Sequence, residues 1–344
     1  MTLKKIRVRA PLRLGLAGGG TDISSYSNIY GGAVLNVTLN KYAYAMIDTL
    51  DATKVIFEAL DKNITIERDL NDEFHLNGEL DLHVASYKYM VLNHNKGKFF
   101  PVRLSTFCEA PPGSGLGSSS TIVVAIIKAL ADYLNVPLDD YQIANIAYKI
   151  EREDCNLKGG KQDQYTATFG GFNFMEFNSD GTVLVNPLRV KNWIKCELES
   201  SLILFFTSIS RDSENIIKDQ VKNVHNNASD TLDAFHNIKS SAISMKEALL
   251  RGNFDAFANE LEFSWREKIK TADSVSNEII NNIYAAAIDA GASAGKLSGA
   301  GGGGFMMLYA PTIKRMDVIR CLEEFDGKVT SCQFSDIGVQ SWTL

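Results

Sequence analysis

A glycine- and serine-rich loop at residues 112–120 is the segment of this chain best suited to bind phosphate. It contains three glycines within five residues, which permits positive φ angles and a close approach of the backbone to a bulky anion. Successive N–H groups can point into one concavity, and a helix expected to begin at Ser118–Thr121 adds the positive end of its dipole. Serine hydroxyls can donate to phosphate oxygens or ligate Mg²⁺. The candidate contacts are Gly113, Ser114, Gly115, Leu116, Gly117, Ser118, Ser119 and Ser120.

Other interpretations of the glycine loops are weaker. For residues 113–120 alone, the alternative is a surface turn with a serine N-cap, but an apolar helix directly behind the loop argues for a rigid frame. No Gly-x-x-x-x-Gly-Lys-Ser/Thr loop occurs in the chain. A Gly-x-Gly-x-x-Gly string at Gly299, Gly301 and Gly304 is expected to follow a helix and precede a strand. That order is the reverse of the dinucleotide-binding context, so an oxidoreductase is disfavoured.

The first half of the chain predicts a sheet covered by helices. Alternating or β-branched runs predict strands, and helical periods predict two helices, of which the second is apolar on all sides and therefore buried. The strands are expected at 6–16, 33–50, 54–67 and 99–110, and the helices at 82–93 and 121–134. A further helix should begin near Asp139, because Asp139 and Gln142 form a capping-box pattern. Residues 170–186 predict a β-hairpin.

The second half predicts a separate lobe. A polar stretch at 187–198 is the expected boundary, which gives domains of 1–187 and 188–344. The later expectations are a strand at 202–207, helices over most of 212–265 and at 277–290, a glycine loop at 295–304, a strand at 305–309, a helix at 314–324 and two final strand-like pieces. This mixed order of strands and helices indicates an α+β fold.

Composition narrows the function classes. The 344 residues include 35 basic and 41 acidic side chains, a net charge of −6 that disfavours nucleic-acid binding. Five scattered cysteines and five histidines without ligand spacing argue against zinc and for reduced thiols. We find no signal peptide and no membrane span, so a cytoplasmic protein without membrane partners is expected.

Three motifs resemble those of the GHMP kinases, the family of galactokinase, homoserine kinase and mevalonate kinase. They are residues 9–22 (Arg-Ala-Pro-Leu-Arg-Leu-Gly-Leu-Ala-Gly-Gly-Gly-Thr-Asp), the loop at 112–120, and residues 296–305 (Lys-Leu-Ser-Gly-Ala-Gly-Gly-Gly-Gly-Phe), in the family's order. The resemblance implies a two-lobed α+β fold, with a lobe like ribosomal protein S5 domain 2 followed by a ferredoxin-like lobe. It also implies ATP, with its phosphates on the second loop and the third loop packed against it.

The resemblance also assigns roles to individual residues. Asp163, within Lys161-Gln162-Asp163-Gln164-Tyr165, corresponds to the catalytic carboxylate, and Glu151, twelve residues earlier, to a Mg²⁺ ligand acting with Ser119. A carboxylate can accept the proton of an attacking hydroxyl, while magnesium takes up charge on the phosphates. Without the resemblance, Asp163 could be a helix cap and Glu151 a solvated helix end.

Substrate residues follow from the first and third motifs. Asp22 corresponds to a carboxylate that binds sugar hydroxyls, and Arg13 is expected beside Asp163. For these two, the alternatives are an Asx turn and a strand-edge ion pair. The substrate-binding set implied is Gly19, Gly20, Thr21, Asp22, Lys161 and Gly302.

The exact residues of the motifs are more specific than the family pattern requires. They resemble those of bacterial D-glycero-D-manno-heptose 7-phosphate kinases and of fucokinases. This implies phosphorylation of the anomeric hydroxyl of a sugar phosphate, on the way to nucleotide-activated heptose for surface polysaccharide. The alternatives are an anomeric kinase of free fucose and a non-catalytic sensor. A phosphorylated substrate needs a cationic receptor, for which the candidates are Lys158, Lys161, Arg266 and Lys268. The oligomeric state, monomer or homodimer, stays open.

Overall fold

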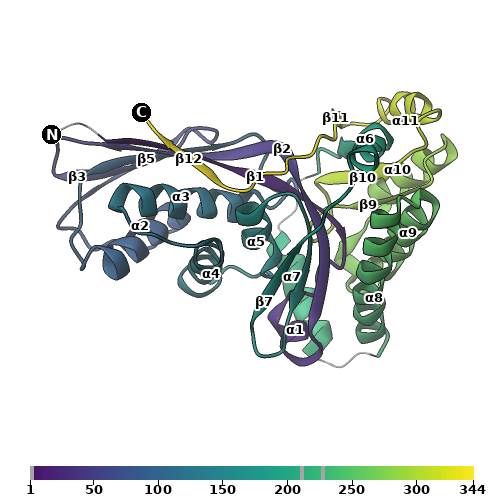
Figure 1. Cartoon of the computed structure of the whole chain (residues 1–344), viewed down its shortest axis with the longest axis horizontal. Helices are drawn as coiled ribbons and strands as arrows, with labels where there is room; N and C mark the ends of the chain where they lie inside the picture. The colour runs from purple at the N-terminus through teal and green to yellow at the C-terminus, as the bar shows by residue number, and fades with distance from the viewer. Residues whose placement is uncertain (1–3, 210–212, 226–228) are drawn as a thin grey trace.

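The computed structural model describes residues 4–209, 213–225 and 229–344, and has two sheets (Figure 1). The larger sheet has the order β12-β1-β2-β5-β3-β4, with β6 paired to β2 and β7 paired to β6. Its strands are β1 (Lys5–Ala17), β2 (Gly32–Thr49), β3 (Lys54–Ala59), β4 (Ile64–Asp69), β5 (Val102–Cys108), β6 (Phe172–Phe177), β7 (Val183–Pro187) and β12 (Gln340–Thr343). β3 and β5 pair in parallel, and the other pairs of this sheet are antiparallel.

The long strand β2 holds the sheet together. Its first part, Gly32–Val37, pairs with β6, and its last part, Ala43–Thr49, pairs with β5. Its pairing with β1 shifts register between Pro11 and Arg13 and again between Gly15 and Ala17. Such irregularities bend a strand and re-aim its side chains. They flank Arg13 and the glycines that follow it, which face the cavity described below.

Four helices cover one face of the larger sheet (Figure 1). They are α2 (Asp81–His94), α3 (Ser118–Leu134), α4 (Asp140–Lys149) and α5 (Gln162–Phe169). The apolar helix α3 is buried between the sheet and its neighbours, as expected from its composition. The predicted capping box is confirmed at α4, where Asp139 accepts from the Gln142 N–H and Gln142 accepts from the Asp139 N–H.

The smaller sheet has the order β11-β8-β10-β9 and lies in the second half of the chain. Its strands are β8 (Leu202–Phe206), β9 (Ala294–Leu297), β10 (Phe305–Tyr309) and β11 (Lys328–Ser331). Alternate residues of β8 face two different cores. Leu202 and Leu204 pack with α6 (Asn192–Ser201), α8 (Ser229–Arg251), α9 (Phe254–Ile269) and β1, whereas Ile203 and Phe205 pack with α10 (Glu278–Asp289) and α11 (Arg315–Leu322). Two further helices, α1 (Ser24–Tyr30) and α7 (Ser213–His225), lie against each other.

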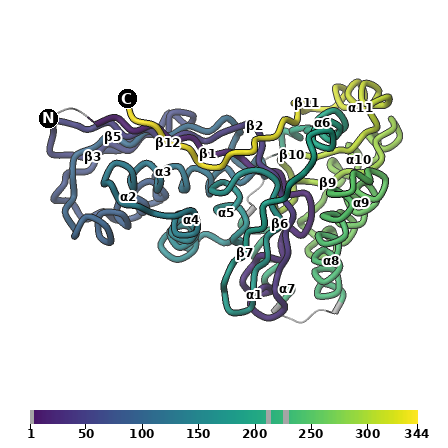
Figure 2. Tube along the Cα trace, viewed as in Figure 1, coloured from purple at the N-terminus to yellow at the C-terminus, as the bar shows by residue number. Residues whose placement is uncertain are grey.

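Three details were not foreseen from the sequence. The polar stretch at 187–198 is predicted as a boundary, but much of it forms helix α6, whose apolar side Ile194 and Leu198 is buried. The Gly299 string is predicted to follow a helix, but it follows strand β9 and joins it to β10. Strand β12 returns along β1, as the adjacent chain ends in Figure 2 show, so residues beyond 187 contribute to both sheets. The division at residue 187 stays a prediction.

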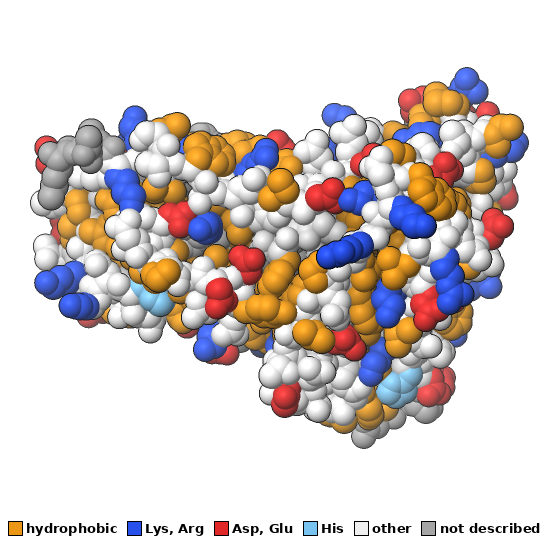
Figure 3. All heavy atoms as spheres, in the orientation of Figure 1, with side chains coloured by type: hydrophobic (Ala, Val, Ile, Leu, Met, Phe, Trp, Pro, Cys, Tyr) orange, Lys and Arg blue, Asp and Glu red, His pale blue; other side chains and the backbone are white. Residues whose placement is uncertain are grey.

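On the face drawn in Figure 3, basic and acidic side chains are interspersed. Within residues 4–209, 213–225 and 229–344, no helix combines the length and hydropathy needed to span a bilayer.

Candidate active site

The phosphate loop adopts the left-handed conformations expected of its glycines. Gly113, Gly115 and Gly117 have φ angles of 72°, 75° and 75°. Gly117 is the residue before α3, so the loop delivers its backbone directly to the positive end of a buried helix. Ser118 and Ser119 lie at the start of that helix and line the cavity. Unpaired N–H groups at a helix start are suited to bind phosphate.

The third glycine loop packs against the phosphate loop, as expected. The Ser298 hydroxyl donates to the Gly115 carbonyl at 2.8 Å, and the Phe305 N–H donates to the Ser114 carbonyl at 2.9 Å. A Cβ at Gly115 would lie 2.4 Å from the Ser298 carbonyl oxygen, so the two backbones leave no room for a side chain there. The two loops therefore form one rigid wall, built from both halves of the chain.

Arg13 and Asp163 form an ion pair at the bottom of the cavity. Arg13 Nε donates to Asp163 Oδ1 at 2.7 Å and Nη2 donates to Oδ2 at 3.1 Å. Arg13 Nη1 also donates to the Gly115 carbonyl at 2.5 Å, which ties the pair to the phosphate loop. A Cβ at Gly117 would lie 3.2 Å from Asp163 Cγ. The arrangement places one oriented carboxylate directly beside the expected phosphates.

Asp22 lies beside this pair and is held by three donors. Its Oδ1 accepts from the Gly20 N–H at 3.1 Å and from Gln162 Nε2 at 3.0 Å, and its Oδ2 accepts from the Gln162 N–H at 3.0 Å. A Cβ at Gly160 would lie 1.9 Å from Oδ2, so the backbone there passes directly against the carboxylate. Burial raises the pKa of Asp22, and the charge of Asp163 adds to that rise, although the Gln162 N–H opposes it.

Glu151 is aimed inward by a short π-helix, Ile150–Asp154, that continues α4. A π-turn places side chains out of step with the preceding helix and is often found at functional sites. The Glu151 carboxylate is fully buried and accepts from the Ser119 hydroxyl at 3.2 Å and from Gln164 Nε2. One carboxylate and one hydroxyl beside a phosphate loop are the ligands Mg²⁺ takes when phosphate oxygens and water supply the rest.

Two buried lysines line the cavity, and burial disfavours the charged form of each. Lys268, from α9, donates to the Gly299 carbonyl, and burial lowers its pKa to about 8, with a further lowering from Arg13 and partial compensation from Asp22 and Asp163. Lys296, from β9, donates to the Leu16 carbonyl at 3.2 Å, and burial lowers its pKa well below the usual range. A negative charge placed beside either lysine favours its protonated form, so an anionic ligand in the cavity would oppose the effect of burial.

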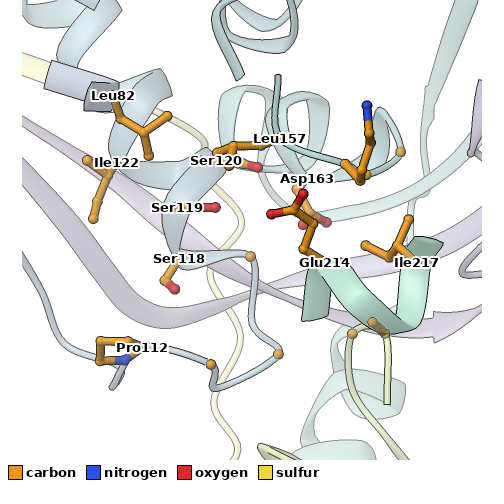
Figure 4. Close-up of a pocket in the computed structure, with 18 of the residues that line it drawn as sticks. Leu82, Pro112, Ser118, Ser119, Ser120, Ile122, Leu157, Asp163, Glu214 and Ile217 are labelled. Carbon is orange, nitrogen blue, oxygen red and sulfur yellow. The ribbon is translucent and has the colours of Figure 1, made fainter. Parts of the chain in front are cut away.

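One cavity of about 730 Å³ lies among these groups. Glu151 is fully buried and does not line it, but is linked to it through the hydrogen bond from Ser119. Figure 4 shows Pro112 and Ser118 on one side, with Asp163, Glu214 and Ile217 across from them. Its polar lining includes Arg13, Asp22, Ser118, Ser119, Ser120 and Asp163, and its walls come from α3, α5, α7, α9 and the three glycine loops. This volume is in the range of small-molecule sites.

Several predicted residues do not line this cavity. The Thr21 hydroxyl donates to the Gly18 and Ala33 carbonyls, so it fixes the first loop, and the Gly302 N–H donates to the Val275 carbonyl. Lys161 Nζ donates to the Gly181 carbonyl at 3.0 Å, away from Asp163. Ser114 and Leu116 are buried within the phosphate loop. Arg266 pairs with Glu262 on an exposed face of α9.

Other residues at the site were not singled out from the sequence: Gln162 lines the cavity, and Gln164 is buried behind it. Gln162 holds Asp22 through both its side chain and its backbone, and Gln164 donates to Glu151. Both are neighbours of Asp163 in the motif at 161–165. That position in the sequence is the signal by which they could have been predicted as site residues. Arg152 also lines the cavity, and its inward direction depends on the π-turn, which no sequence pattern predicted.

Comparison with known proteins defines the class. The chain matches the GHMP kinases N terminal domain over residues 82–171 and the GHMP kinases C terminal domain over residues 245–325. It is 45% identical over 342 residues to a D-glycero-alpha-D-manno-heptose 7-phosphate kinase of Campylobacter jejuni, with 99% of this chain and 100% of the relative covered. The fold and the site thus define a phosphotransferase, and the chain belongs to the GHMP kinase family, in which ATP is the phosphoryl donor.

Solved structures agree with this assignment. The chain superposes with a TM-score of 0.83 and 40% identity on a D-glycero-D-manno-heptose 1-phosphate kinase from Bacteroides thetaiotaomicron, with 98% of this chain and 99% of that chain covered. A galactokinase of Lactococcus lactis complexed with galactose, 17% identical, has a TM-score of 0.77, with 98% of this chain and 95% of that one covered. At that identity the likeness concerns the fold alone.

Proposed function

We propose that this protein transfers the γ-phosphoryl group of ATP to the anomeric hydroxyl of D-glycero-D-manno-heptose 7-phosphate, giving the 1,7-bisphosphate. The observation that carries the proposal is the juxtaposition, in one cavity, of the phosphate loop, the Arg13–Asp163 pair and Asp22. The full-length similarity to a heptose 7-phosphate kinase supports the choice of sugar. The alternative substrate is a free sugar such as L-fucose, since the chain is 24% identical to part of an L-fucokinase/L-fucose-1-P guanylyltransferase of Bacteroides fragilis, matching 34% of its length.

The reaction needs an acceptor hydroxyl in line with the γ-phosphorus of ATP. The N–H groups of the phosphate loop and the start of α3 hold the phosphates, and Asp163, beside that loop, accepts the proton of the attacking hydroxyl. Arg13 keeps the Asp163 carboxylate oriented and supplies positive charge toward the transferring group. Asp22 has lone pairs beyond its three protein donors and accepts hydroxyl hydrogen bonds from the sugar.

Magnesium fits the residues present beside the phosphate loop. Glu151 and Ser119 are the residues that would hold it, because the Ser119 hydroxyl lies 3.2 Å from Glu151 Oε1 at the start of the helix behind the phosphate loop. The other carboxylate oxygen, Oε2, accepts from Gln164 Nε2 and lies 4.0 Å from Arg152 Nη2. When bound, the ion would neutralise charge on the β- and γ-phosphates. No cluster of three His, Cys, Asp or Glu side chains suited to a metal occurs among the described residues, so phosphate oxygens and water would supply the remaining ligands.

The chemistry of the proposed product indicates which class of reaction would use it. A sugar 1,7-bisphosphate retains a phosphate on the anomeric carbon, which nucleotidyl transfer requires once the distal phosphate is removed. The proposal therefore includes a role in making nucleotide-activated heptose for surface polysaccharide, and a cytoplasmic location where ATP is available.

Phosphorus NMR tests the proposal directly. Protein with Mg·ATP and D-glycero-D-manno-heptose 7-phosphate should yield ADP and a new anomeric-phosphate resonance coupled to the anomeric proton. The Asp163→Asn variant, shown to be folded, is the matched control and should yield neither at a comparable rate.

Two results would redirect the assignment. Product from fucose but not from the heptose phosphate would favour the free-sugar alternative. Binding of ATP and sugar with no ADP released from any sugar in a panel would identify a non-catalytic sensor.

A further inference from the structure

A second cavity, of about 520 Å³, adjoins the one described above. The two share the lining residues Ile23, Arg152, Leu157, Lys158, Gly159 and Ile217. The second is completed by Ser24, Ser25, Asn28 and Ile29 of α1, Tyr148 of α4 and Val221 of α7. A ligand seated on Asp22 in the first cavity therefore has a route into the second.

Arg152 stands at the junction with its hydrogen-bond donors poorly satisfied. Its side chain is 14% exposed, and Nη2 lies 4.0 Å from Glu151 Oε2, beyond hydrogen-bond distance. Nη1 and Nη2 reach the Lys158 and Gly160 carbonyls only at 3.4 Å. Arg152 Nε is buried and has no hydrogen-bond partner among the described residues. A buried guanidinium donor without an acceptor is costly, which indicates a missing anionic ligand.

Other donors converge on the same cavity. The Ser25 hydroxyl is buried and has no partner within the part of the chain that the structure describes. Lys158 lines both cavities, and its Nζ donates to the neutral Asn156 side chain at 2.9 Å. One guanidinium, one ammonium and one hydroxyl at a junction of cavities form a receptor for a phosphate group.

We infer that Arg152, with Lys158 and Ser25, binds the distal phosphate of the sugar substrate. The inference rests on the proposed function and specifies its substrate class as a sugar already phosphorylated at the end remote from the reacting hydroxyl. The backbone at Gly159 and Gly160 supports this placement of the distal phosphate relative to the sugar hydroxyls. Gly160 lies against the Asp22 carboxylate, and a Cβ at Gly159 would lie 2.4 Å from Arg152 Nη2. The backbone at residues 159–160 thus contacts both Asp22, which binds the sugar hydroxyls, and Arg152, which binds the phosphate.

The nucleotide is the competing source of phosphate for Arg152. Glu151, its neighbour in sequence, faces Ser119 and the phosphate loop, whereas Arg152 opens toward α1 and the second cavity. The geometry therefore assigns the two residues to different phosphates, with Glu151 on the side of ATP and Arg152 on the side of the acceptor.

The test compares two acceptors that differ only in the distal phosphate, D-glycero-D-manno-heptose 7-phosphate and D-glycero-D-manno-heptose. Arg152→Gln should raise the KM of the phosphorylated sugar about tenfold to hundredfold, the loss expected for a charged hydrogen-bonded contact. The KM of ATP, the kcat and the kinetic constants for the unphosphorylated sugar should change less than about threefold, within the usual range for an uninvolved group. Arg152→Lys should recover part of the loss. Lys149→Gln, at an exposed lysine that lines neither cavity, is the matched control.

Three outcomes overturn the inference. A rise in the KM of ATP would place Arg152 on the nucleotide. An equal loss for both sugars would show that it positions the loop at 157–160. Unchanged constants for both sugars would remove it from substrate binding.

A binding measurement separates this inference from the proposed reaction. Inorganic phosphate is titrated into the ATP-free protein and followed by ³¹P line broadening, with the wild type compared with Arg152→Gln. If the wild type fails to phosphorylate the heptose phosphate but its phosphate binding depends on Arg152, the reaction is wrong and the anion site stands. If phosphate broadens equally in both proteins or in neither, the anion site is wrong whatever the reaction.

Discussion

Arg13 donates to both carboxylate oxygens of Asp163, through Nε at 2.7 Å and through Nη2 at 3.1 Å, although the residues are 150 positions apart in the chain. Strand β1 supplies the guanidinium and the first turn of α5 supplies the carboxylate. A two-point contact fixes the orientation of both groups, which one bond would not. Because Arg13 also binds the Gly115 carbonyl, the pair and the phosphate loop keep one mutual geometry.

Asp163→Asn should lower kcat by about 10² to 10⁴, because an amide cannot accept the hydroxyl proton. ATP binding should persist, since the phosphate loop is untouched. Steady-state kinetics and nucleotide binding measure the two effects. Asp180→Asn, at an exposed hairpin carboxylate that binds Thr182, is the control and should leave kcat unchanged. Near wild-type turnover by Asp163→Asn would rule out proton acceptance at this position.

Arg13→Lys should lower kcat by about tenfold or more while preserving the net charge. An ammonium is a point charge and cannot hold both Asp163 oxygens together with the Gly115 carbonyl in the same geometry. The loss should appear mainly in kcat, because the contact orients a reacting group. Initial-rate kinetics with each substrate varied will separate the constants. A change confined to the KM of ATP would instead make Arg13 a phosphate-binding residue.

Glu151→Gln should raise the Mg²⁺ concentration needed for half-maximal activity, on the order of tenfold or more, as for other disturbed metal sites. The amide keeps the volume but removes the charged ligand. Binding of Mn²⁺ to the enzyme–nucleotide complex, followed by electron paramagnetic resonance, gives a readout independent of turnover. Glu153→Gln, at an exposed position of the same π-turn, is the control. Equal metal dependence in the two variants would move the metal away from Glu151.

Gly160→Ala should weaken sugar binding and leave ATP binding unchanged. The new methyl would lie 1.9 Å from Asp22 Oδ2, so the carboxylate or the loop must move. A rise of about tenfold in the KM of the sugar is expected if one hydroxyl contact is lost. Gly97→Ala is the control for a strained glycine substitution away from Asp22, since its φ is 71° and no atom of the described chain lies within 4 Å of the position that its Cβ would take. An unaltered KM would mean that Asp22 does not contact the sugar.

The lowered pKa of Lys268 leads us to expect a specific pH dependence of the free energy of unfolding. Burial lowers its folded pKa to about 8 from 10.5. Between those values the unfolded chain binds a proton that the folded chain does not, so wild-type stability should rise with pH relative to Lys268→Met, by roughly 3 kcal/mol over that window. Denaturant unfolding of both proteins at pH 7, 8, 9 and 10 measures the difference. A constant difference across this range would show that Lys268 keeps its ordinary pKa.

Local features of the fold were predictable because neighbours in sequence decide them. The capping box at Asp139, the buried helix behind the phosphate loop and the hairpin around 178–181 are confirmed. In contrast, α6 was missed because its 187–198 region is polar on average, and only its apolar side is buried. The return of β12 to β1 was not predictable either, because pairing partners across the whole chain compete for an edge.

The sequence by itself determined the class of this protein: its three glycine motifs fix the backbone conformations that a phosphate site needs, and the GHMP kinase assignment is confirmed. Only the tertiary structure decided which polar side chains meet. It placed Gln162 on Asp22, turned Thr21 and Lys161 to backbone carbonyls, and left Arg152 Nε without a partner among the described residues at the junction of two cavities. The physical reason is that backbone conformation follows from local residue types, whereas the direction of a side chain depends on the π-turns, bulges and packing that surround it.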